Sequence, residues 1–332
     1  MDSVAGPKIV MIGGGTGSFT LLSGLKQYVQ DITALVCMAD DGGSTGQLRD
    51  ELGVLPPGDV RQCLVALSNS PKVRELFNYR FEEGTLKGHN FGNLFLTALE
   101  KMTGNFAEAV ELAGSVLRIT GNVEPITLTN VKLCMKSTNG RKILGEYIIG
   151  HAKFKQQRPK LWLEPKAVLN PKAKKAILEA DMVVIAPGNL YGSLAPALIV
   201  PGLYKVLEAS KAKKIYVCNL VTKPGQTDGF KVNDFAEEIE RFAGGSFLTH
   251  VLFNTAKPSK ELLDKYADDG EFAVDYDNEP MKAAHYIPKG SDIIAKEIKG
   301  KRSRHDPIAK TRTLIRHDPD KVAKQLMRIY FS

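Results

Sequence analysis

The chain has 332 residues, of which 43% are hydrophobic and 25% charged, values ordinary for a globular protein of one large α/β domain. No apolar run approaches the roughly 20 residues that cross a bilayer, and the N-terminus lacks a signal-peptide pattern, so we expect a cytoplasmic protein without a transmembrane segment. Four scattered cysteines and six dispersed histidines argue against disulfides and a zinc site.

The net charge of +8 comes largely from a segment after residue 296. Because its charges lack interleaved aromatic residues, we expect a solvated basic surface, or contact with an anionic ligand or membrane surface, and no nucleic acid partner.

Strand-like and helix-like patterns alternate along the first half of the chain. Buried strands are expected at 8–12 and 32–38, and amphipathic helices at 19–29, 60–68 and 90–102. Asp59 and Asn90 are candidate N-caps for the second and third of these helices. Two strand-like runs flank Asn139-Gly140, a pair suited to a type I′ turn, and they predict a hairpin insertion at about 123–168.

The α/β pattern returns from residue 176. Strands are expected at 182–186, 215–218 and 247–254, and helices at 232–242 and 258–267. A basic segment and a last helix, with Pro319 in its first turn, occupy about 296–332. This alternation predicts a single α/β domain over 1–332, a Rossmann-like doubly wound, mostly parallel sheet with an antiparallel hairpin excursion around 125–165. Ligands of such sheets bind at the carboxyl ends of the strands, near the point where strand order reverses.

A glycine-rich loop follows the first expected strand. It supplies the first two glycines of the dinucleotide fingerprint, but it has serine at the third position and lacks the Gly-Lys-Ser/Thr of a Walker loop. Its last amides open a helix whose positive end attracts anions, so we interpret it as a phosphate loop, with a tight structural turn as the alternative. The candidate ligand-binding residues here are Gly13, Gly14, Gly15, Thr16, Gly17 and Ser18.

A second glycine loop follows the second expected strand. Asp40 and Asp41 are candidates to bind ribose hydroxyls or to hold Mg²⁺, which usually takes one or two carboxylates plus phosphate oxygens; a turn with solvated acids is the alternative. Arg49 is expected to pair with a phosphate, or with Glu51 on the surface. Glycines of this loop, Gly46 among them, leave the backbone free to wrap a ligand. The candidate ligand-binding residues are Asp40, Gly42, Gly43, Ser44 and Arg49.

Four further loops are rich in glycine and in short polar residues, at 57–59, 89–93, 188–193 and 219–227. Helix capping alone is the alternative for the first two. We expect all of these loops to converge at one edge of the sheet. Asp40, Asp41, Asp59 and His89 are candidate catalytic groups, without an assigned role. The candidate ligand-binding residues are Pro57, Gly58, Asp59, His89, Asn90, Asn93, Gly188, Asn189, Leu190, Ser193, Asn219, Thr222, Lys223 and Thr227.

The loop motifs occur in the order IGGGTGS, ADDGGSTGQLR, LPPGDVRQCL, GHNFGNLFL, APGNLYGSLAPALIVPGL, CNLVTKPGQTDGF and RHDP. Together, from about residue 8 to 320, they resemble the bacterial gluconeogenesis factor (YvcK-like) branch of a superfamily. The other well-known branch is the archaeal 2-phospho-L-lactate transferase (CofD-like). The first two motifs are shared by both branches, and the later pair is more similar to the first branch. The sequence departs from the family pattern at Asn90, Asn189, Gly192, Lys223 and Gln226. At Lys223 and Gln226, where glutamine and glutamate are usual, the changes make the surroundings of the site more positive.

This resemblance implies a Rossmann-like fold and a nucleotide or nucleotide-sugar ligand. Members of the gluconeogenesis factor branch bind UDP-sugars and are linked to cell shape and envelope synthesis, so envelope-synthesis proteins are implied partners. The transferase branch implies Mg²⁺ and a guanosine nucleotide (GDP), and NAD is also associated with the fold. In this resemblance Asp40 and Asp41 match positions near metal or ribose, and Thr16 and Asn189 match positions near phosphates. Asn219 and Thr222 match positions that line the pocket.

Three functions follow as expectations. The first, implied by the resemblance, is a nucleotide-sugar-binding regulator. No serine–histidine or cysteine–histidine arrangement is legible in the sequence, which fits a regulator and fits equally well a transferase that works by positioning and a metal ion. The second is a magnesium-dependent transferase of the 2-phospho-L-lactate type, with Asp59 or His89 as base. The third is an NAD-dependent oxidoreductase. A homo-oligomer is also expected.

Overall fold

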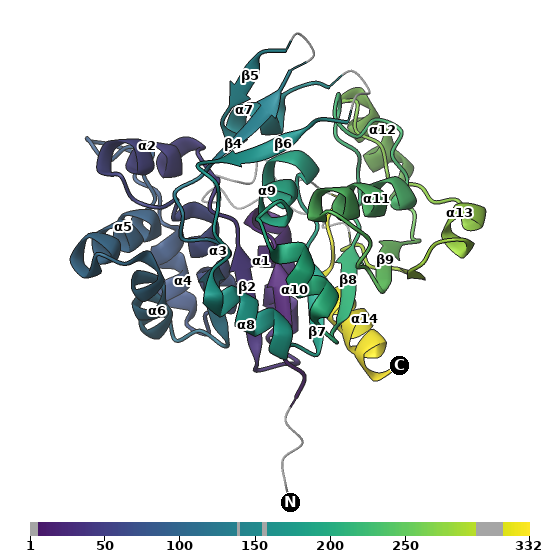
Figure 1. Ribbon diagram of the computed structural model, residues 1–332, viewed down its shortest axis with the longest axis horizontal. Helices are drawn as coiled ribbons and strands as arrows, with labels where there is room; N and C mark the ends of the chain where they lie inside the picture. The colour runs from purple at the N-terminus through teal and green to yellow at the C-terminus, as the bar shows by residue number, and fades with distance from the viewer. Residues whose placement is uncertain (1–5, 138–139, 155–157, 297–314) are drawn as a thin grey trace, which may run out of the picture.

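The structure is a computed structural model that describes residues 6–137, 140–154, 158–296 and 315–332. Its centre is a seven-stranded sheet in the order β10-β9-β8-β7-β1-β2-β3, and every pair of neighbouring strands is parallel (Figure 1). The predicted doubly wound α/β fold is therefore confirmed. The strands are β1 (Ile9–Ile12), β2 (Ile32–Val36), β3 (Asn122–Pro125), β7 (Met182–Ile185), β8 (Lys213–Val217), β9 (His250–Asn254) and β10 (Ile287–Ser291).

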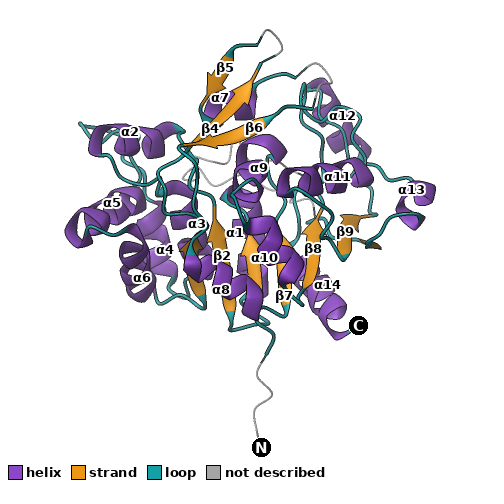
Figure 2. Cartoon of the chain, in the orientation of Figure 1, coloured by secondary structure: helices purple, strands orange, loops and turns teal. Residues whose placement is uncertain are grey.

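Helices cover both faces of this sheet (Figure 2). One face carries α1 (Gly15–Leu25), α3 (Gly58–Leu67), α4 (Pro71–Asn78), α5 (Phe91–Thr103), α6 (Phe106–Leu117) and α14 (Pro319–Phe331). The other carries α8 (Pro171–Glu179), the π-helical turn η1 (Leu190–Leu194), α9 (Ala195–Leu198), α10 (Leu203–Ala209) and α11 (Val232–Ala243). Toward the periphery lie α2 (Gly43–Leu52), α12 (Lys260–Asp268) and α13 (Asn278–Lys282).

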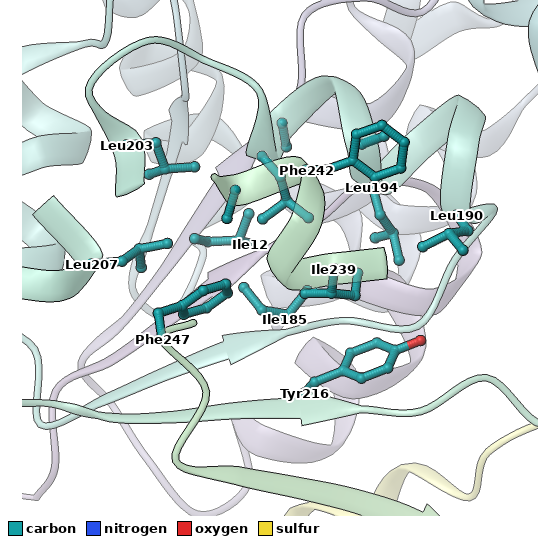
Figure 3. Packing of buried hydrophobic residues seen from close by; sticks show 14 of the residues in the cluster. Ile12, Ile185, Leu190, Leu194, Leu203, Leu207, Tyr216, Ile239, Phe242 and Phe247 are labelled. Carbon is teal, nitrogen blue, oxygen red and sulfur yellow. The ribbon is translucent and has the colours of Figure 1, made fainter. Parts of the chain in front are cut away.

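Strand β1 shows why the sheet is buried on both sides. Val10 and Ile12 point into the apolar cluster under α8–α11, and Ile9 and Met11 point into the cluster under α1, α3 and α14. Figure 3 shows the first cluster, where side chains of β1, β7 and β8 meet those of α11. Because a continuous apolar strand has partners on both faces, its carboxyl end is held rigidly, and the loop that follows is positioned by the core.

A small antiparallel sheet lies above the carboxyl ends of the main strands, at the top of Figure 1. Its strands are β4 (Lys132–Lys136), β5 (Lys142–Leu144) and β6 (Leu161–Glu164), in the order β5-β4-β6. The expected pairing of β4 with β5 is present, although Asn139 of the turn lies outside the described residues. The second run does not continue as a strand: Gly145 has φ +111°, and helix α7 (Glu146–His151) follows it.

Other boundaries differ from expectation for local reasons. Residue 123 belongs to β3 of the main sheet, so the excursion begins later than predicted. Asp59 is not the N-cap of α3: Pro57 occupies that place and Asp59 lies in the first turn. Helix α2 begins inside the expected glycine loop, and Gly46 is needed there because a Cβ would lie 2.1 Å from the carbonyl oxygen of Asp41. Strand β10, of sequence IPKGS, has no apolar alternation and was not predicted.

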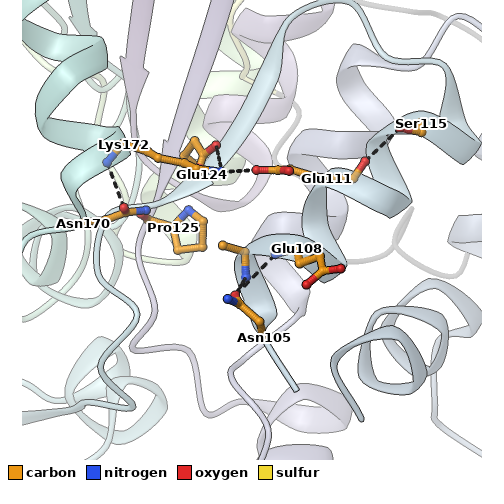
Figure 4. A network of polar contacts seen from close by, with 9 residues as sticks. Asn105, Glu108, Glu111, Ser115, Glu124, Pro125, Asn170 and Lys172 are labelled. Atoms are coloured by element: carbon orange, nitrogen blue, oxygen red, sulfur yellow. Dashed lines mark hydrogen bonds and ion pairs between the residues drawn. The ribbon is translucent and has the colours of Figure 1, made fainter. Parts of the chain in front are cut away.

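A polar network fastens the β3 edge of the sheet (Figure 4). Lys172 of α8 pairs with Glu111 of α6 and lies 4.0 Å from Glu124 of β3. Asn170 caps α8 and also donates to the carbonyl of Pro125.

Among the described residues no single helix is long and apolar enough to cross a membrane. The helices Leu190–Leu198 and Leu203–Ala209 reach the necessary length and hydropathy only when they are taken together, and they are bent by 72° relative to each other.

Candidate functional site

Strand order reverses at β1, whose neighbours are β2 on one side and β7 on the other. The segments that follow β2 and β7 enclose, together with α3 and α7, a cavity of about 240 Å³, which we call the acidic cavity. Crevices at such reversal points are the usual ligand sites of doubly wound sheets. The cavity is lined by Cys37, Asp40, Asp59, Gln62, Glu146, Gly192 and Ser193.

The glycine loop runs directly from β1 into α1. Gly14 is the N-cap, and Gly15 has φ +65°, a conformation that favours glycine. A Cβ on Gly14 would lie 2.0 Å from Oδ2 of Asp59, and one on Gly17 would lie 1.8 Å from the carbonyl oxygen of Pro187. The loop is therefore packed tightly against α3 and the β7 loop, while exposed Thr16 presents the first turn of α1 outward.

Three carboxyl groups share the acidic cavity. Burial, and then the charge of Asp40, raises the pKa of Asp59 to about 7. Burial, followed by the charges of Asp40 and Asp59, raises the pKa of Glu146 to about 8, and burial also raises the pKa of Asp40. Arg49, Arg61 and Lys223 oppose these rises in pKa, but their effects are smaller than those of burial. The cavity therefore favours either protonation or a bound cation.

Magnesium was expected at Asp40 and Asp41. The structure instead brings Asp40 and Asp59 to the cavity: a Cβ on Gly58 would lie 2.7 Å from Oδ2 of Asp40, and Asp59 follows Gly58 directly. In the described part of the chain no three His, Cys, Asp or Glu side chains are grouped so that they could hold a metal ion. Mg²⁺ is usually bound by one or two carboxylates, and phosphate oxygens and water complete its coordination. Asp40 and Asp59 supply two such carboxylates.

Glu146 lines the cavity and was not predicted from the sequence, and the same is true of Cys37 and Gln62. Glu146 comes from α7 above the sheet, and not from a loop after a main strand. The one available signal was weak: an acidic residue directly after Gly145, following a strand-like run. Gly192 makes room for it, because a Cβ there would lie 2.5 Å from Oε1 of Glu146.

Loop side chains hold both ends of α7. At its start, Oδ1 of Asp41 accepts the amide of Tyr147 at 2.8 Å. At its end, Gln226 donates to the carbonyls of residues 149, 150 and 152, and Asn189 and Lys223 both donate to the carbonyl of residue 150. Asp41, Asn189 and Lys223, predicted as ligand-binding or metal-binding residues, thus position Glu146 over the cavity.

Replacing Gln226 by methionine tests this arrangement. The change removes the donor to three carbonyls and keeps the volume, so we expect a loss of about 1 to 2 kcal/mol in the free energy of unfolding. Hydrogen exchange of the amides in 146–152 should accelerate. Gln47→Met on the exposed face of α2 is the control; equal effects of both changes would show that α7 does not depend on Gln226.

Most predicted residues of the β8 loop fasten the backbone. Asn219 holds the amide and the carbonyl of Gly188, at 3.3 and 2.7 Å. The hydroxyl of Thr222 accepts the amide of residue 272, and that of Thr227 accepts the amide of residue 223.

Two predicted residues of the segment after β7 have different surroundings. Leu190 is buried in the apolar core, whereas Ser193 lines the acidic cavity.

A second polar cluster joins the start of α5 to α2 and α3. Asn90 caps α5 as predicted, the hydroxyl of Ser44 lies 3.1 Å from Nδ1 of His89, and Asn93 donates to that hydroxyl. Buried Arg61, which was not predicted, donates to Asn93 and Asn78, and burial lowers its pKa to about 10. The predicted residues Ser44, His89, Asn90 and Asn93 are thus together, but they do not line the acidic cavity.

Arg49, expected to reach a phosphate, is buried within α2. Its Nη2 donates to the carbonyl of Val131, and its Nη1 has no hydrogen-bond partner among the described residues. The alternative pairing with exposed Glu51 does not form. The guanidinium thus connects α2 to the segment that leads into β4. Gly42 and Gly43 lie at the start of α2, beside Asp40, whose Oδ1 accepts the amide of Gly42.

The fold and the cavity define a doubly wound α/β protein whose candidate ligand site is the carboxyl edge of the sheet at β1 and β7. The model of the family "2-phospho-L-lactate transferase CofD" matches residues 9–294. The chain belongs to this family, in the branch of the gluconeogenesis factors.

Several relatives support that assignment. The gluconeogenesis factor of Bacillus subtilis is 38% identical over 324 residues, which cover 97% of each chain. A Thermoanaerobacterium thermosulfurigenes relative is 42% identical over 326 residues, which cover 97% of this chain and 96% of that one. A crystal structure of a Bacillus halodurans protein of the UPF0052 family is 36% identical, covers 96% of this chain and 99% of that one, and superposes with a TM-score of 0.86.

Proposed function

We propose that this protein binds a nucleotide-linked ligand of the UDP-sugar type at the acidic cavity and acts as a regulator that links carbon metabolism to envelope synthesis and cell shape. The observation that carries the proposal is the junction of the glycine loop and α1, which packs against Asp59 of the cavity lining at the point of strand-order reversal. The positive end of α1 favours a phosphate there. The name of the relatives, gluconeogenesis factor, supports a role in carbon metabolism.

A phosphate beside three carboxyl groups needs a positive charge between them. Asp40 and Asp59 would hold Mg²⁺ at the mouth of the phosphate site, where the ion would neutralise both the carboxylates and the phosphates. The protein's own residues supply the rest: the amides at the start of α1 orient the phosphates, and α7 covers the cavity with Glu146.

Thermal unfolding against a panel of UDP-sugars, guanosine nucleotides and NAD, each with and without MgCl₂, tests the proposal. A compound present at about 100 times its Kd should stabilise the protein by roughly 2.7 kcal/mol. We expect UDP-N-acetylglucosamine to give the largest shift and Mg²⁺ to increase it. A flat response to all compounds would contradict nucleotide binding, and a response to NAD alone would favour an oxidoreductase.

The raised pKa values favour one alternative, a transferase that acts on a guanosine-linked phospholactate. A general base works best with a pKa near the ambient pH, and Asp59, with its pKa raised to about 7, meets that condition. The test is turnover of guanosine-linked phospholactate with a deazaflavin alcohol in the presence of Mg²⁺. Product formation that Asp59→Asn abolishes would favour the transferase; binding of UDP-sugars without turnover would favour the regulator.

A further inference from the structure

A second cavity, of about 310 Å³, lies at the other end of α7, against the small sheet; we call it the basic cavity. Its apolar wall includes Met135 of β4, Ile143 of β5 and buried Phe154. Phe154 packs edge-to-face on Tyr191 at 4.9 Å between ring centroids, and its amide donates to the carbonyl of Gly225. These contacts hold the apolar wall of the cavity against the hydrophobic core of the main sheet.

Positive charge surrounds this apolar wall. Lys136, Lys153, Lys160 and Arg158 line the basic cavity, and no acidic residue is found among its described lining residues. Arg158 is paired with Glu237 and Glu238, but within the described part of the chain the three lysines form no ion pair. An anion bound there would gain three charge contacts without displacing an existing one.

We propose that the basic cavity binds a small organic anion with an apolar body. An aromatic or aliphatic body contacts the wall, and a sulfonate, carboxylate or phosphate group lies among the lysines. Cavities of roughly 300 Å³ or more, mostly apolar and with a few placed polar groups, are typical of small-molecule sites. Ala152, the C-cap of α7, lines this cavity while Glu146 lines the acidic one, so the two sites lie at opposite ends of the same helix.

Fluorescence titration with 8-anilinonaphthalene-1-sulfonate tests the site, because the neutral analogue N-phenyl-1-naphthylamine has the same body without the anion. We expect the sulfonate to bind the wild type at least tenfold more tightly than the neutral probe. The double variant Lys136→Gln/Lys160→Gln should weaken sulfonate binding by about tenfold, the loss of two partly exposed ionic contacts, and leave the neutral probe unchanged.

Matched variants separate the cavity from general surface attraction. Lys205→Gln/Lys211→Gln on an exposed surface changes the net charge equally and should alter sulfonate binding less than twofold. Ile143→Phe, which fills part of the cavity without a change of charge, should weaken both probes. Equal losses in the two double variants, or unchanged binding in Lys136→Gln/Lys160→Gln, would overturn the proposal. Thermal unfolding of each variant establishes that it is folded.

Discussion

Asp59→Asn is expected to stabilise the free protein at alkaline pH, by about 4 kcal/mol near pH ~8.5. The pKa of Asp59 is raised from 3.8 to about 7 in the folded chain, and one pKa unit corresponds to about 1.4 kcal/mol. Asparagine keeps an oxygen that can accept the amide of Gly15, and it removes the charge that Asp40 and Glu146 face. The measurement is urea unfolding of both proteins over a range of pH without divalent cations.

The sign of the pH dependence follows from the direction of these shifts. Between about pH 4 and 7 the folded protein keeps a proton on Asp59 that the unfolded chain releases, so the free energy of unfolding of the wild type falls as the pH rises. Glu146, with its pKa raised to about 8, extends this fall to about pH 8. The variant should match the wild type near pH 4 and gain on it up to about pH 8.

Asp264→Asn, on the exposed surface of α12, is the matched control and should change stability by less than about 0.5 kcal/mol at every pH. The inference that the carboxyl groups of the cavity lack a compensating cation would be contradicted if Asp59→Asn destabilised the protein at about pH 8.5. It would also be contradicted if the variant differed from the wild type by the same amount at all pH values. MgCl₂ at high pH should stabilise the wild type and have little effect on the Asp59 variant, since the cation would lose one of two carboxylates.

Local sequence patterns were sufficient to predict the parallel sheet and the loops at its edge, on which the site is built. The apolar runs of β1 and β2, each ending in a glycine-containing loop, predicted a parallel sheet with its loops at one edge, because strand, turn and helix are each legible within about a dozen residues. Asn90 was likewise recognised as a cap because capping depends on residues three positions apart. Asp40 and Ser193 lie in the segments after β2 and β7, whose carboxyl ends meet at the edge of the sheet where the cavity lies.

The roles of the other site residues could not be predicted from the sequence, because tertiary contacts determine where their side chains lie. Glu146 reaches the cavity only because Asp41 and Gln226, distant in sequence, hold α7 from both ends. Asn219 and Thr227 look like ligand-binding residues in the sequence, but Asn219 accepts the amide of Gly188 in the neighbouring loop, and Thr227 accepts the amide of Lys223 in its own loop. A polar side chain in a glycine-rich loop serves backbone and ligand equally well, and only the fold decides between them. Buried Arg61 lies inside the motif LPPGDVRQCL, but the sequence did not indicate that its side chain joins a polar cluster.

Thr16→Glu is expected to weaken binding of UDP-N-acetylglucosamine by about 100-fold or more while leaving the fold intact. Thr16 is exposed in the first turn of α1, where a carboxylate interacts favourably with the helix dipole and adds about 0.3 to 1 kcal/mol of stability. The same carboxylate would repel a phosphate at that end of the helix by about 1 to 4 kcal/mol at about 4 Å. Stability and binding should therefore change in opposite directions, which general damage to the site could not produce.

Thr16→Gln is the control, because it places a neutral side chain of the same size at the same position and should change the affinity by less than about fivefold. Calorimetric titration with UDP-N-acetylglucosamine and with GDP measures both variants, and thermal unfolding measures their stability. Equal affinities of the glutamate and glutamine variants would mean that no phosphate lies at the start of α1. The glycine loop would then be a structural turn that packs α1 against Asp59 and Pro187. A loss confined to the glutamate variant would instead require the phosphate to lie within a few ångströms of Thr16, on the same side of the sheet as the acidic cavity.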